Sequence, residues 1–227
     1  MPKSYAQPTW PFQERGMKGM QNKPWNANIH YDALLASLAS PGDRVLDVGC
    51  GDGFLSARLA EFGCQVVALD ADAGVLERAK QRWPQHRIDW LHDDLLKVDL
   101  PLGSFDVVLS NATLHHLPDV AQALTRMATL ARPGAQLGVV GFARNGFWDW
   151  PMSIIGAVLL FVISKARGQW EHTAPIAWPP ALTYGGVKRV AKAVWPGCTF
   201  QRLWLGRFFL KWTKAGAGPL TTAKILV

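Results

Sequence analysis

The sequence predicts an α/β protein with a doubly wound, mostly parallel sheet that is completed by a C-terminal antiparallel hairpin. Apolar runs of strand length alternate with amphipathic helical segments from about residue 41 to residue 142. The first apolar run ends in a glycine-rich turn, residues 47–53, and an amphipathic segment follows at once. Near the C-terminus, two strand-like runs flank Gly206-Arg207, which is typical of a hairpin with glycine first in a two-residue turn.

The N-terminal third supplies the first helix and the first strand. Residues 1–24 lack periodicity, and we expect them to be irregular. Residues 26–38 are helical in pattern, because Leu34, Leu35 and Leu38 lie on one stripe. Pro41-Gly42 ends that helix, and the first strand follows.

The following elements alternate in type. Helices are predicted over residues 54–62, 73–83 and 119–131, and strands over 66–70, 88–91, 105–111 and 137–140. Short connections between such elements imply a parallel sheet that is covered on both faces. Ligands of such sheets bind outside the carboxyl ends of the strands. A last helix is expected over residues 184–194, before hairpin strands at 199–205 and 208–213.

Residues 143–182 are the least regular part. The apolar run 152–164 has 13 residues, and a membrane span needs about 20. Its apolar side chains lie on all faces, which favours burial over lying in a membrane interface. We expect a cap helix laid across the mouth of the site. A core helix, a dimer surface and a membrane contact remain alternatives.

Composition describes an ordinary globular protein, with 49% hydrophobic and 18% charged residues. The three cysteines are widely spaced, so neither a metal site nor a disulfide framework is expected. No apolar run begins the chain, and we expect no signal peptide and a cytoplasmic location. Charge is uneven: residues 144–227 carry 11 Lys and Arg against 2 Asp and Glu. Such a surface suits an anionic partner or is simply a solvated face.

The glycine-rich turn predicts a bound cofactor. Nicotinamide dinucleotides need a third glycine three residues after the second, whereas Gly51 is followed by Gly53 and then Phe54. Asp70 ends the second strand 19 residues beyond Gly51, where a carboxylate can accept hydrogen bonds from a ribose diol. A doubly wound domain that binds another nucleotide is the competing interpretation.

These features together resemble the class I S-adenosylmethionine-dependent methyltransferases of the small-molecule type. Five landmarks carry the resemblance in one order: residues 45–53, 66–70, 88–94, 104–117 and 132–140. The resemblance implies a Rossmann-like, seven-stranded sheet and S-adenosylmethionine as cofactor. It also implies one domain over residues 1–227, with a helical lid (1–40), a cofactor-binding core (41–142), a cap insertion (143–182) and a C-terminal helix and hairpin (183–227).

The same resemblance assigns the cofactor-binding residues. The glycine turn would let the cofactor approach, the acid before it would orient the methionine ammonium, and the acid after the second strand would hold the ribose. An acid after the third strand would contact the adenine, and the loop after the fourth strand would contact the methionine portion and the acceptor. The residues are Asp47, Gly49, Cys50, Gly51, Asp70, Ala71, Asp93 or Asp94, and Asn111.

Catalytic residues are harder to assign, since methyl transfer needs a base only where the acceptor must lose a proton. His30 and Tyr31 lie on the helix that folds over the cofactor in this family. In the pair His115-His116, one side chain can face the site, and His116 is the candidate. His172 is a further candidate from the cap.

The acceptor is expected to be an apolar or aromatic small molecule, methylated on oxygen or nitrogen. Seven of the eleven tryptophans follow residue 143, and aromatic walls stack on rings. Residues 110–114 lack the Pro-Pro-aromatic string of nucleic-acid amino-methylating enzymes, so no nucleic acid is expected. Alternatives are a lipid or quinone methyltransferase acting at a membrane surface, and a catalytically silent cofactor-binding subunit. Either a monomer or a homodimer is compatible with the sequence.

Overall fold

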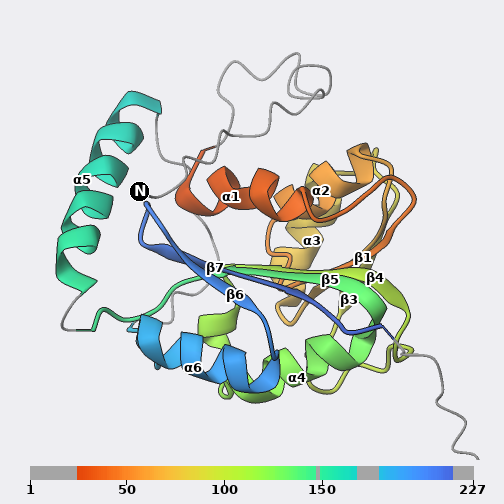
Figure 1. Ribbon diagram of the computed structural model, residues 1–227. Coiled ribbons are helices and arrows are strands. Elements are labelled where there is room, and N and C mark those ends of the chain that lie inside the picture. Colours follow the sequence, from red (N-terminus) through yellow and green to blue (C-terminus); the bar gives the residue numbers. More distant parts are fainter. Residues whose placement is uncertain (1–24, 147–148, 168–178, 217–227) are drawn as a thin grey trace, which may run out of the picture.

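The computed structural model describes residues 25–146, 149–167 and 179–216 (Figure 1). It contains one seven-stranded sheet with the order β3-β2-β1-β4-β5-β7-β6. Strands β1 to β5 are parallel, whereas β7 runs antiparallel to both β5 and β6. The strands are β1 (Arg44–Val48), β2 (Gln65–Asp70), β3 (Ile88–His92), β4 (Phe105–Asn111), β5 (Ala131–Gly141), β6 (Thr199–Leu203) and β7 (Arg207–Thr213). The predicted fold class is confirmed.

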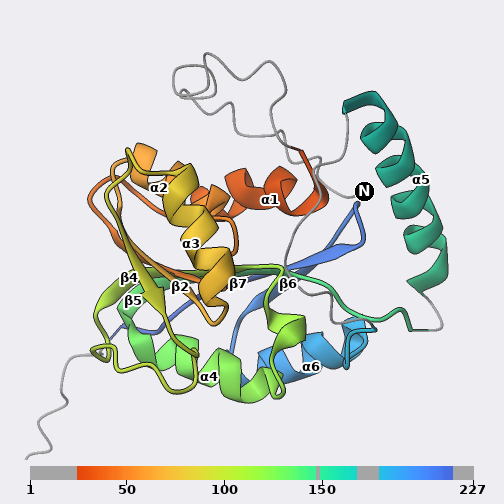
Figure 2. The same cartoon turned by 180° about the vertical axis from the view of Figure 1, so that it is seen from behind.

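Helices cover both faces of the sheet. Figures 1 and 2 show α1, α2 and α3 over one face and α4 and α6 over the other, with α5 standing at one side. The helices are α1 (Ala27–Ala36), α2 (Phe54–Glu61), α3 (Ala73–Arg82), α4 (Val120–Leu130), α5 (Trp150–Arg167) and α6 (Tyr184–Val194), with a short 3₁₀ turn, η1 (Leu114–His116).

Each central strand contributes to two apolar layers, because successive side chains of a strand point to opposite faces. In β1, Val45 packs with Leu35 in the layer under α1 and α2, whereas Leu46 packs with Leu124 in the layer over α4. All four side chains are fully buried, and so is that of Val108 of β4. This two-sided burial explains why the strands appear in the sequence as continuous apolar runs.

Polar caps set the beginnings of the helices where the sequence predicts them. The Asn26 side chain accepts from the N–H groups of Asn28 and Ile29 at the start of α1. Asp72 and Asp119 cap α3 and α4 in the same way. Each such cap stabilises the fold by about 1 kcal/mol.

Two predicted boundaries differ from the structure. The hairpin turn is not the two-residue Gly206-Arg207, because Arg207 already pairs with Leu203 as the first residue of β7. Residues 204–206 therefore form the turn, and β6 ends at Leu203. The strand predicted over residues 137–140 is longer in the structure, because β5 begins at Ala131 with an irregular register against β4.

The predicted burial of the apolar helix is wrong. α5 exposes six large apolar side chains on one side: Ile154, Ile155, Val158, Leu159, Phe161 and Val162. On the other side, Leu160 and Ile163 pack against the layer under α1. Gly156 faces the carbonyl of Trp204 so closely that a Cβ there would lie 2.4 Å from it. α5 therefore packs by one narrow stripe against the β6–β7 turn.

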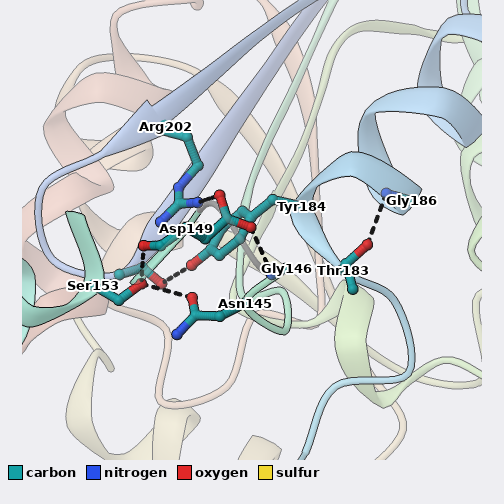
Figure 3. Close-up of polar contacts among 9 residues, drawn as sticks. Asn145, Gly146, Asp149, Ser153, Thr183, Tyr184, Gly186 and Arg202 are labelled. Atoms are coloured by element: carbon teal, nitrogen blue, oxygen red, sulfur yellow. Dashed lines mark hydrogen bonds and ion pairs between the residues drawn. The ribbon is translucent and has the colours of Figure 1, made fainter. Parts of the chain in front are cut away.

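A polar cluster holds the start of α5 against β6 and α6 (Figure 3). Asp149 forms an ion pair with Arg202 of β6, and its second oxygen accepts from the Gly146 N–H at 2.7 Å. The Arg202 guanidinium lies 3.4 Å from the ring centroid of Tyr184. Ser153 donates to the backbone carbonyl of Asp149 at 2.9 Å. The base of α5 is thus fixed although most of its length is exposed.

The tryptophans of the C-terminal third occupy different environments. Trp195 is fully buried, and its ring stacks on that of Trp212 with centroids 5.5 Å apart. Trp204 is 61% exposed because it lies in the hairpin turn. The predicted aromatic wall of the cap depends on the side chains of Trp148, Trp150, Trp170 and Trp178, which lie outside the described residues.

The three cysteines are all buried and free. Burial raises the pKa of each thiol above its ordinary value. Over the described ranges, none of the helices combines the length and the apolar character that a membrane crossing requires.

Candidate cofactor site and the neighbouring apolar pocket

A pocket of about 390 Å³ opens at the carboxyl ends of β1 and β4, under the first turns of α1. This is the switch point of the sheet, where the chain leaves β1 to continue in β2 on one side while β4 pairs on the other. The lining residues are Asn28, Ile29, Asp32, Asp47, Gly49, Cys50, Gly51, Asp52, Phe54, Leu55 and Asn111. Of the nine predicted cofactor-binding residues, the structure therefore brings Asp47, Gly49, Cys50, Gly51 and Asn111 into one wall.

The three glycines of the turn have left-handed backbone angles, with φ of 69°, 53° and 75° at Gly49, Gly51 and Gly53. Their missing side chains serve different purposes. A Cβ at Gly49 would lie 2.1 Å from Oγ1 of Thr113, and one at Gly53 would lie 2.6 Å from the Trp90 ring. A Cβ at Gly51 would meet no described atom within 4 Å. Gly51 therefore faces open space, whereas Gly49 and Gly53 lie against neighbouring side chains.

Asp47 lies at the bottom of this pocket, at the end of β1. Its side chain is 1% exposed, and the Ser56 hydroxyl donates to it at 2.6 Å. Desolvation raises the pKa of Asp47 to about 7, with a smaller upward contribution from the charge of Asp70. The Ser56 hydrogen bond opposes that shift. A ligand cation would favour the ionised form of Asp47.

Asp32 is a second buried carboxylate of this wall, and the sequence-based assignment missed it. Asn111 donates through Nδ2 to Asp32 Oδ1 at 2.8 Å and to the carbonyl of Asn28 at 3.0 Å. Burial raises the pKa of Asp32 to about 7. Oδ1 of Asn111 is buried and has no hydrogen-bond partner within the described ranges. A signal was present in the sequence, since Asp32 lies three residues before Leu35 on the buried stripe of α1.

Asp70 lies beside the glycine turn at the end of β2. Its two oxygens accept from the N–H groups of Gly51 at 2.8 Å and Asp72 at 2.9 Å. These bonds hold the second turn glycine in its left-handed conformation. The carboxylate keeps further lone pairs for a ligand hydroxyl.

The remaining predicted cofactor residues lie close to Asp70. The Asp93 N–H donates to the Asp70 carbonyl at 3.1 Å. The Asp93 and Asp94 carboxylates accept from the N–H groups of Asp94 and Leu96, so both stabilise the turn after β3. Ala71 is exposed. These three residues are not among the lining residues of the pocket.

The candidate bases occupy different environments. His30 and His116 are exposed, and His172 lies outside the described residues. Tyr31 is 7% exposed, and its hydroxyl accepts from the Leu205 N–H at 3.3 Å. Burial raises the pKa of Tyr31 above its ordinary value, so the phenol keeps its proton at neutral pH.

His115, rather than His116, is the partly buried member of its pair. Its Nδ1 is buried and has no hydrogen-bond partner among the described atoms. Desolvation lowers the pKa of His115 to about 4, and the charges of His116 and Arg207 act in the same direction. The imidazole is therefore neutral at physiological pH.

A second pocket, of about 290 Å³, lies on the other side of the loop after β4. Its lining is apolar apart from His115: Leu114, Leu117, Val120, Phe142, Pro180, Ala181, Leu182, Val187 and Phe208. The loop of residues 111–117 therefore contributes to both pockets, with Asn111 in the first and His115 in the second. Across the described part of the chain, no group of three or more His, Cys, Asp or Glu side chains could hold a metal ion.

Comparison with known proteins identifies the family. The family described as "Methyltransferase domain" matches residues 46–139. An uncharacterised methyltransferase of Mycobacterium tuberculosis is 45% identical over 196 residues, which cover 84% of this chain and 98% of that protein. A ubiquinone biosynthesis O-methyltransferase of Hahella chejuensis is 33% identical over 147 residues, covering 63% of this chain and 61% of that protein.

Solved structures share the fold at low sequence identity. A SAM-dependent methyltransferase from Aquifex aeolicus superposes with a TM-score of 0.57 at 17% identity, covering 79% of this chain and 87% of that one. The 1,6-didemethyltoxoflavin-N1-methyltransferase of Burkholderia thailandensis gives a TM-score of 0.58 at 21% identity, covering 83% of this chain and 79% of that one. The mycobacterial relative is 45% identical and is covered over 98% of its own length. Together with the family match and the shared fold, this similarity shows that the chain belongs to the class I S-adenosylmethionine-dependent methyltransferases, with S-adenosylmethionine as its cofactor.

Proposed function

We propose that the protein transfers the methyl group of S-adenosylmethionine to an oxygen or nitrogen atom of an apolar or aromatic small molecule. The observation that carries the proposal is the apolar pocket beside the cofactor pocket, which shares with it the loop of residues 111–117. The apolar lining of that pocket favours an apolar or aromatic group of the acceptor. We expect the reaction in the cytoplasm, without nucleic acid, in a monomer or homodimer.

The larger pocket has the chemistry that the cofactor requires. Asp47 and the unpartnered Oδ1 of Asn111 are acceptors for the ammonium group of the methionine portion. Gly51 leaves space against the backbone. Asp70 is not a lining residue of the pocket, but it accepts from the Gly51 N–H beside it and is our proposed acceptor for the ribose hydroxyls. Asp32 adds a second buried carboxylate near the same ammonium. Asp93 or Asp94 remains our proposal for the adenine contact.

When bound, S-adenosylmethionine supplies a methyl group that is already electrophilic on its sulfonium. The new bond to oxygen or nitrogen forms as the carbon–sulfur bond breaks, so the protein must hold the acceptor in line and exclude water. Tyr31 keeps its proton and is suited to orient the acceptor by donating a hydrogen bond. Neutral His115 lines the apolar pocket with an unpartnered Nδ1, which can form a hydrogen bond to the acceptor. His30 and His116 are less favoured because both are exposed.

The direct test is incubation of the protein with methyl-labelled cofactor and fractionated small-molecule extract, followed by identification of the labelled product. We expect one labelled product of low molecular mass and apolar or aromatic character. Binding of S-adenosylhomocysteine without transfer to any fraction would favour a catalytically silent subunit. Uptake of a nicotinamide or flavin nucleotide in place of S-adenosylhomocysteine would contradict the proposal altogether.

Cofactor binding should depend on pH through Asp47. The pKa of about 7 in the free protein must fall when a ligand ammonium lies beside the carboxylate, so binding releases a proton below pH 7. We expect affinity for S-adenosylhomocysteine to rise by up to about tenfold from pH 6 to pH 7 and then to level off. Calorimetry in two buffers of different ionisation enthalpy measures the released proton. Asp47→Asn should weaken the pH dependence and leave the part that Asp32 contributes, whereas a flat wild-type profile would exclude a role for this carboxylate.

Asp70 should matter for cofactor affinity more than its neighbour Asp72. Asp70→Ala removes an acceptor for the ribose and frees the Gly51 N–H, so we expect affinity for S-adenosylhomocysteine to fall by about 1–3 kcal/mol. Asp72→Ala is the matched control, because it removes only the cap of α3. That variant should lose about 1 kcal/mol of stability at unchanged affinity. Equal affinities for both variants would remove Asp70 from the site.

A second candidate function is methylation of a lipid or quinone at a membrane surface. The exposed apolar side of α5 favours it, because contiguous apolar surface of this kind marks an interaction site. Lys165 is exposed near the end of the same helix, and the C-terminal third is strongly basic. The similarity to a ubiquinone biosynthesis O-methyltransferase also supports it.

Liposome co-sedimentation separates this candidate from the first. We expect the wild type to sediment with anionic vesicles and Phe161→Asp, at a side chain that is 64% exposed on α5, to lose that binding at least fivefold. Leu102→Asp is the matched control, since Leu102 is 67% exposed but lies outside α5. If the wild type stays in the supernatant, or if both variants lose binding equally, α5 does not contact the membrane.

A further inference from the structure

Arg207 is a buried cation in β7, at the end of the sheet where the carboxyl ends of the parallel strands and the two pockets lie. It begins β7, next to Phe208, which pairs with the last residue of β5, Gly141. Its side chain is 7% exposed. The guanidinium lies 3.3 Å from the ring centroid of Phe142. The sequence pattern predicts a hairpin turn at Gly206-Arg207 and does not reveal this burial.

The hydrogen bonds of Arg207 leave part of its donor capacity unused. Nε and Nη2 donate to Oδ1 of Asn28 at 3.2 and 3.0 Å, and Nη1 donates to the carbonyl of Leu205 at 3.0 Å. These bonds use three of the five N–H groups of a guanidinium. Both acceptor atoms, Oδ1 of Asn28 and the Leu205 carbonyl, are uncharged amide oxygens, so they satisfy hydrogen bonds without neutralising the charge.

No carboxylate within the described ranges forms an ion pair with Arg207. By contrast, Arg202, on the adjacent strand, is paired with Asp149, and Arg132 is paired with Asp106. The titratable groups near Arg207 are Tyr31 and Tyr184, both of which keep their protons at neutral pH, and neutral His115. Burial lowers the pKa of Arg207 to about 9, so it stays charged at pH 7. A buried charge without a partner is costly, and such charges are normally paired.

Arg207 contacts the walls of both pockets. Asn28, which accepts two of its hydrogen bonds, lines the cofactor pocket, and Phe142, on which it stacks, lines the apolar pocket. The guanidinium therefore lies between a lining residue of the cofactor pocket and a lining residue of the apolar pocket, where the reacting end of the acceptor is expected.

We infer that Arg207 binds a carboxylate group of the methyl acceptor, with the rest of the acceptor in the apolar pocket beside Phe142. This inference rests on the proposed function and narrows its substrate to an apolar or aromatic acid. The planar guanidinium matches the two oxygens of a carboxylate. A single buried positive charge balances a monoanion, whereas a phosphate monoester would leave negative charge uncompensated among Tyr31, Tyr184 and neutral His115. Arg207 is thus a specificity-determining residue.

The test compares benzoate with benzamide, which has the same shape and no charge. Binding is measured by ligand-observed NMR at pH 7 with S-adenosylhomocysteine saturating the cofactor pocket. We expect benzoate to bind at least tenfold more tightly than benzamide to the wild type. Phenyl phosphate is a third ligand, and we expect it to bind more weakly than benzoate.

Two variants test whether the preference for benzoate over benzamide depends on Arg207. Arg207→Met should abolish the preference for benzoate while retaining affinity for S-adenosylhomocysteine. Arg202→Met is the matched control, since Arg202 also stacks on an aromatic ring but is already paired with Asp149. That variant should keep the full preference for benzoate. Affinity for S-adenosylhomocysteine and the thermal midpoint report whether each variant is folded.

The outcomes are distinct. Equal binding of benzoate and benzamide to the wild type would overturn the inference, and this result does not depend on any variant folding. A preference that persists in Arg207→Met would overturn it too, and tighter binding of phenyl phosphate would exclude a carboxylate. If S-adenosylhomocysteine itself does not bind, the proposed function fails. Intact cofactor binding without carboxylate preference is a failure of this inference alone.

Discussion

Gly51→Ala is expected to abolish binding of S-adenosylhomocysteine while the protein stays folded, and Gly49→Ala is expected to unfold it. Both glycines have positive φ, so each alanine carries a backbone cost of about 1–2 kcal/mol. The new Cβ at position 51 enters the open space of the cofactor pocket, where no described atom lies within 4 Å. It therefore adds no clash in the free protein and takes volume from the ligand. We expect affinity to fall at least a hundredfold, about 2.7 kcal/mol.

The Cβ at position 49 has no such space. It would lie 2.1 Å from Oγ1 and 2.6 Å from Cβ of Thr113, whose hydroxyl donates to the Gly49 carbonyl at 3.0 Å. Relieving the clash requires moving the loop after β4 away from the turn. Together with the positive φ, we expect a loss of at least 3 kcal/mol of stability.

Urea denaturation of the free proteins and calorimetry with S-adenosylhomocysteine measure the two effects separately. Thr113→Gly in the Gly49→Ala background should restore part of the stability, because it removes the atoms that clash. Normal affinity in Gly51→Ala would mean that the cofactor lies elsewhere. Wild-type stability in Gly49→Ala would show that the turn and the loop are not in contact.

Trp195→Ala should cost about 3–5 kcal/mol of stability. The ring is fully buried beneath α4 and stacks on Trp212, and its Nε1 donates to the Leu124 carbonyl at 3.0 Å. Truncation leaves a large cavity and removes this hydrogen bond to the Leu124 carbonyl. The thermal midpoint should fall on the order of 10 °C.

Trp204→Ala is the matched control, since Trp204 is 61% exposed in the hairpin turn only nine positions away. Its effect should stay within about 0.5 kcal/mol. Both variants, when folded, should bind S-adenosylhomocysteine as tightly as the wild type, because neither ring lines the cofactor pocket. Similar losses of stability in the two variants would contradict the burial pattern.

The sequence predicts those parts of the fold that depend on local pattern. The strand runs around Leu46 and Val108 are apolar because both of their faces are buried, and this pattern identifies them directly. Helix beginnings follow from side-chain caps such as Asn26 and Asp119. The cofactor turn is equally visible, since left-handed backbone demands glycine at Gly49 and Gly51.

Features that depend on tertiary contacts were missed. The hairpin turn includes Trp204 and Leu205 rather than Arg207, because pairing with Leu203 extends β7 by one residue. Arg207 is buried by Asn28 and Phe142, which lie 179 and 65 positions away in the sequence, so no local pattern reveals it. The exposure of α5 likewise depends on which elements lie beside it. A helix that is apolar on all sides is normally buried, and only the packing shows otherwise.

All three native thiols are buried, so they should react only slowly with thiol-directed labels. Cys50, Cys64 and Cys198 combine burial with raised pKa values, and the thiolate that maleimides and oxidants attack is therefore scarce in each. One cysteine introduced at an exposed position, such as Val158 on α5, would then be the preferred site of labelling. A spin label or fluorophore can thus be attached to that helix without first removing a native residue.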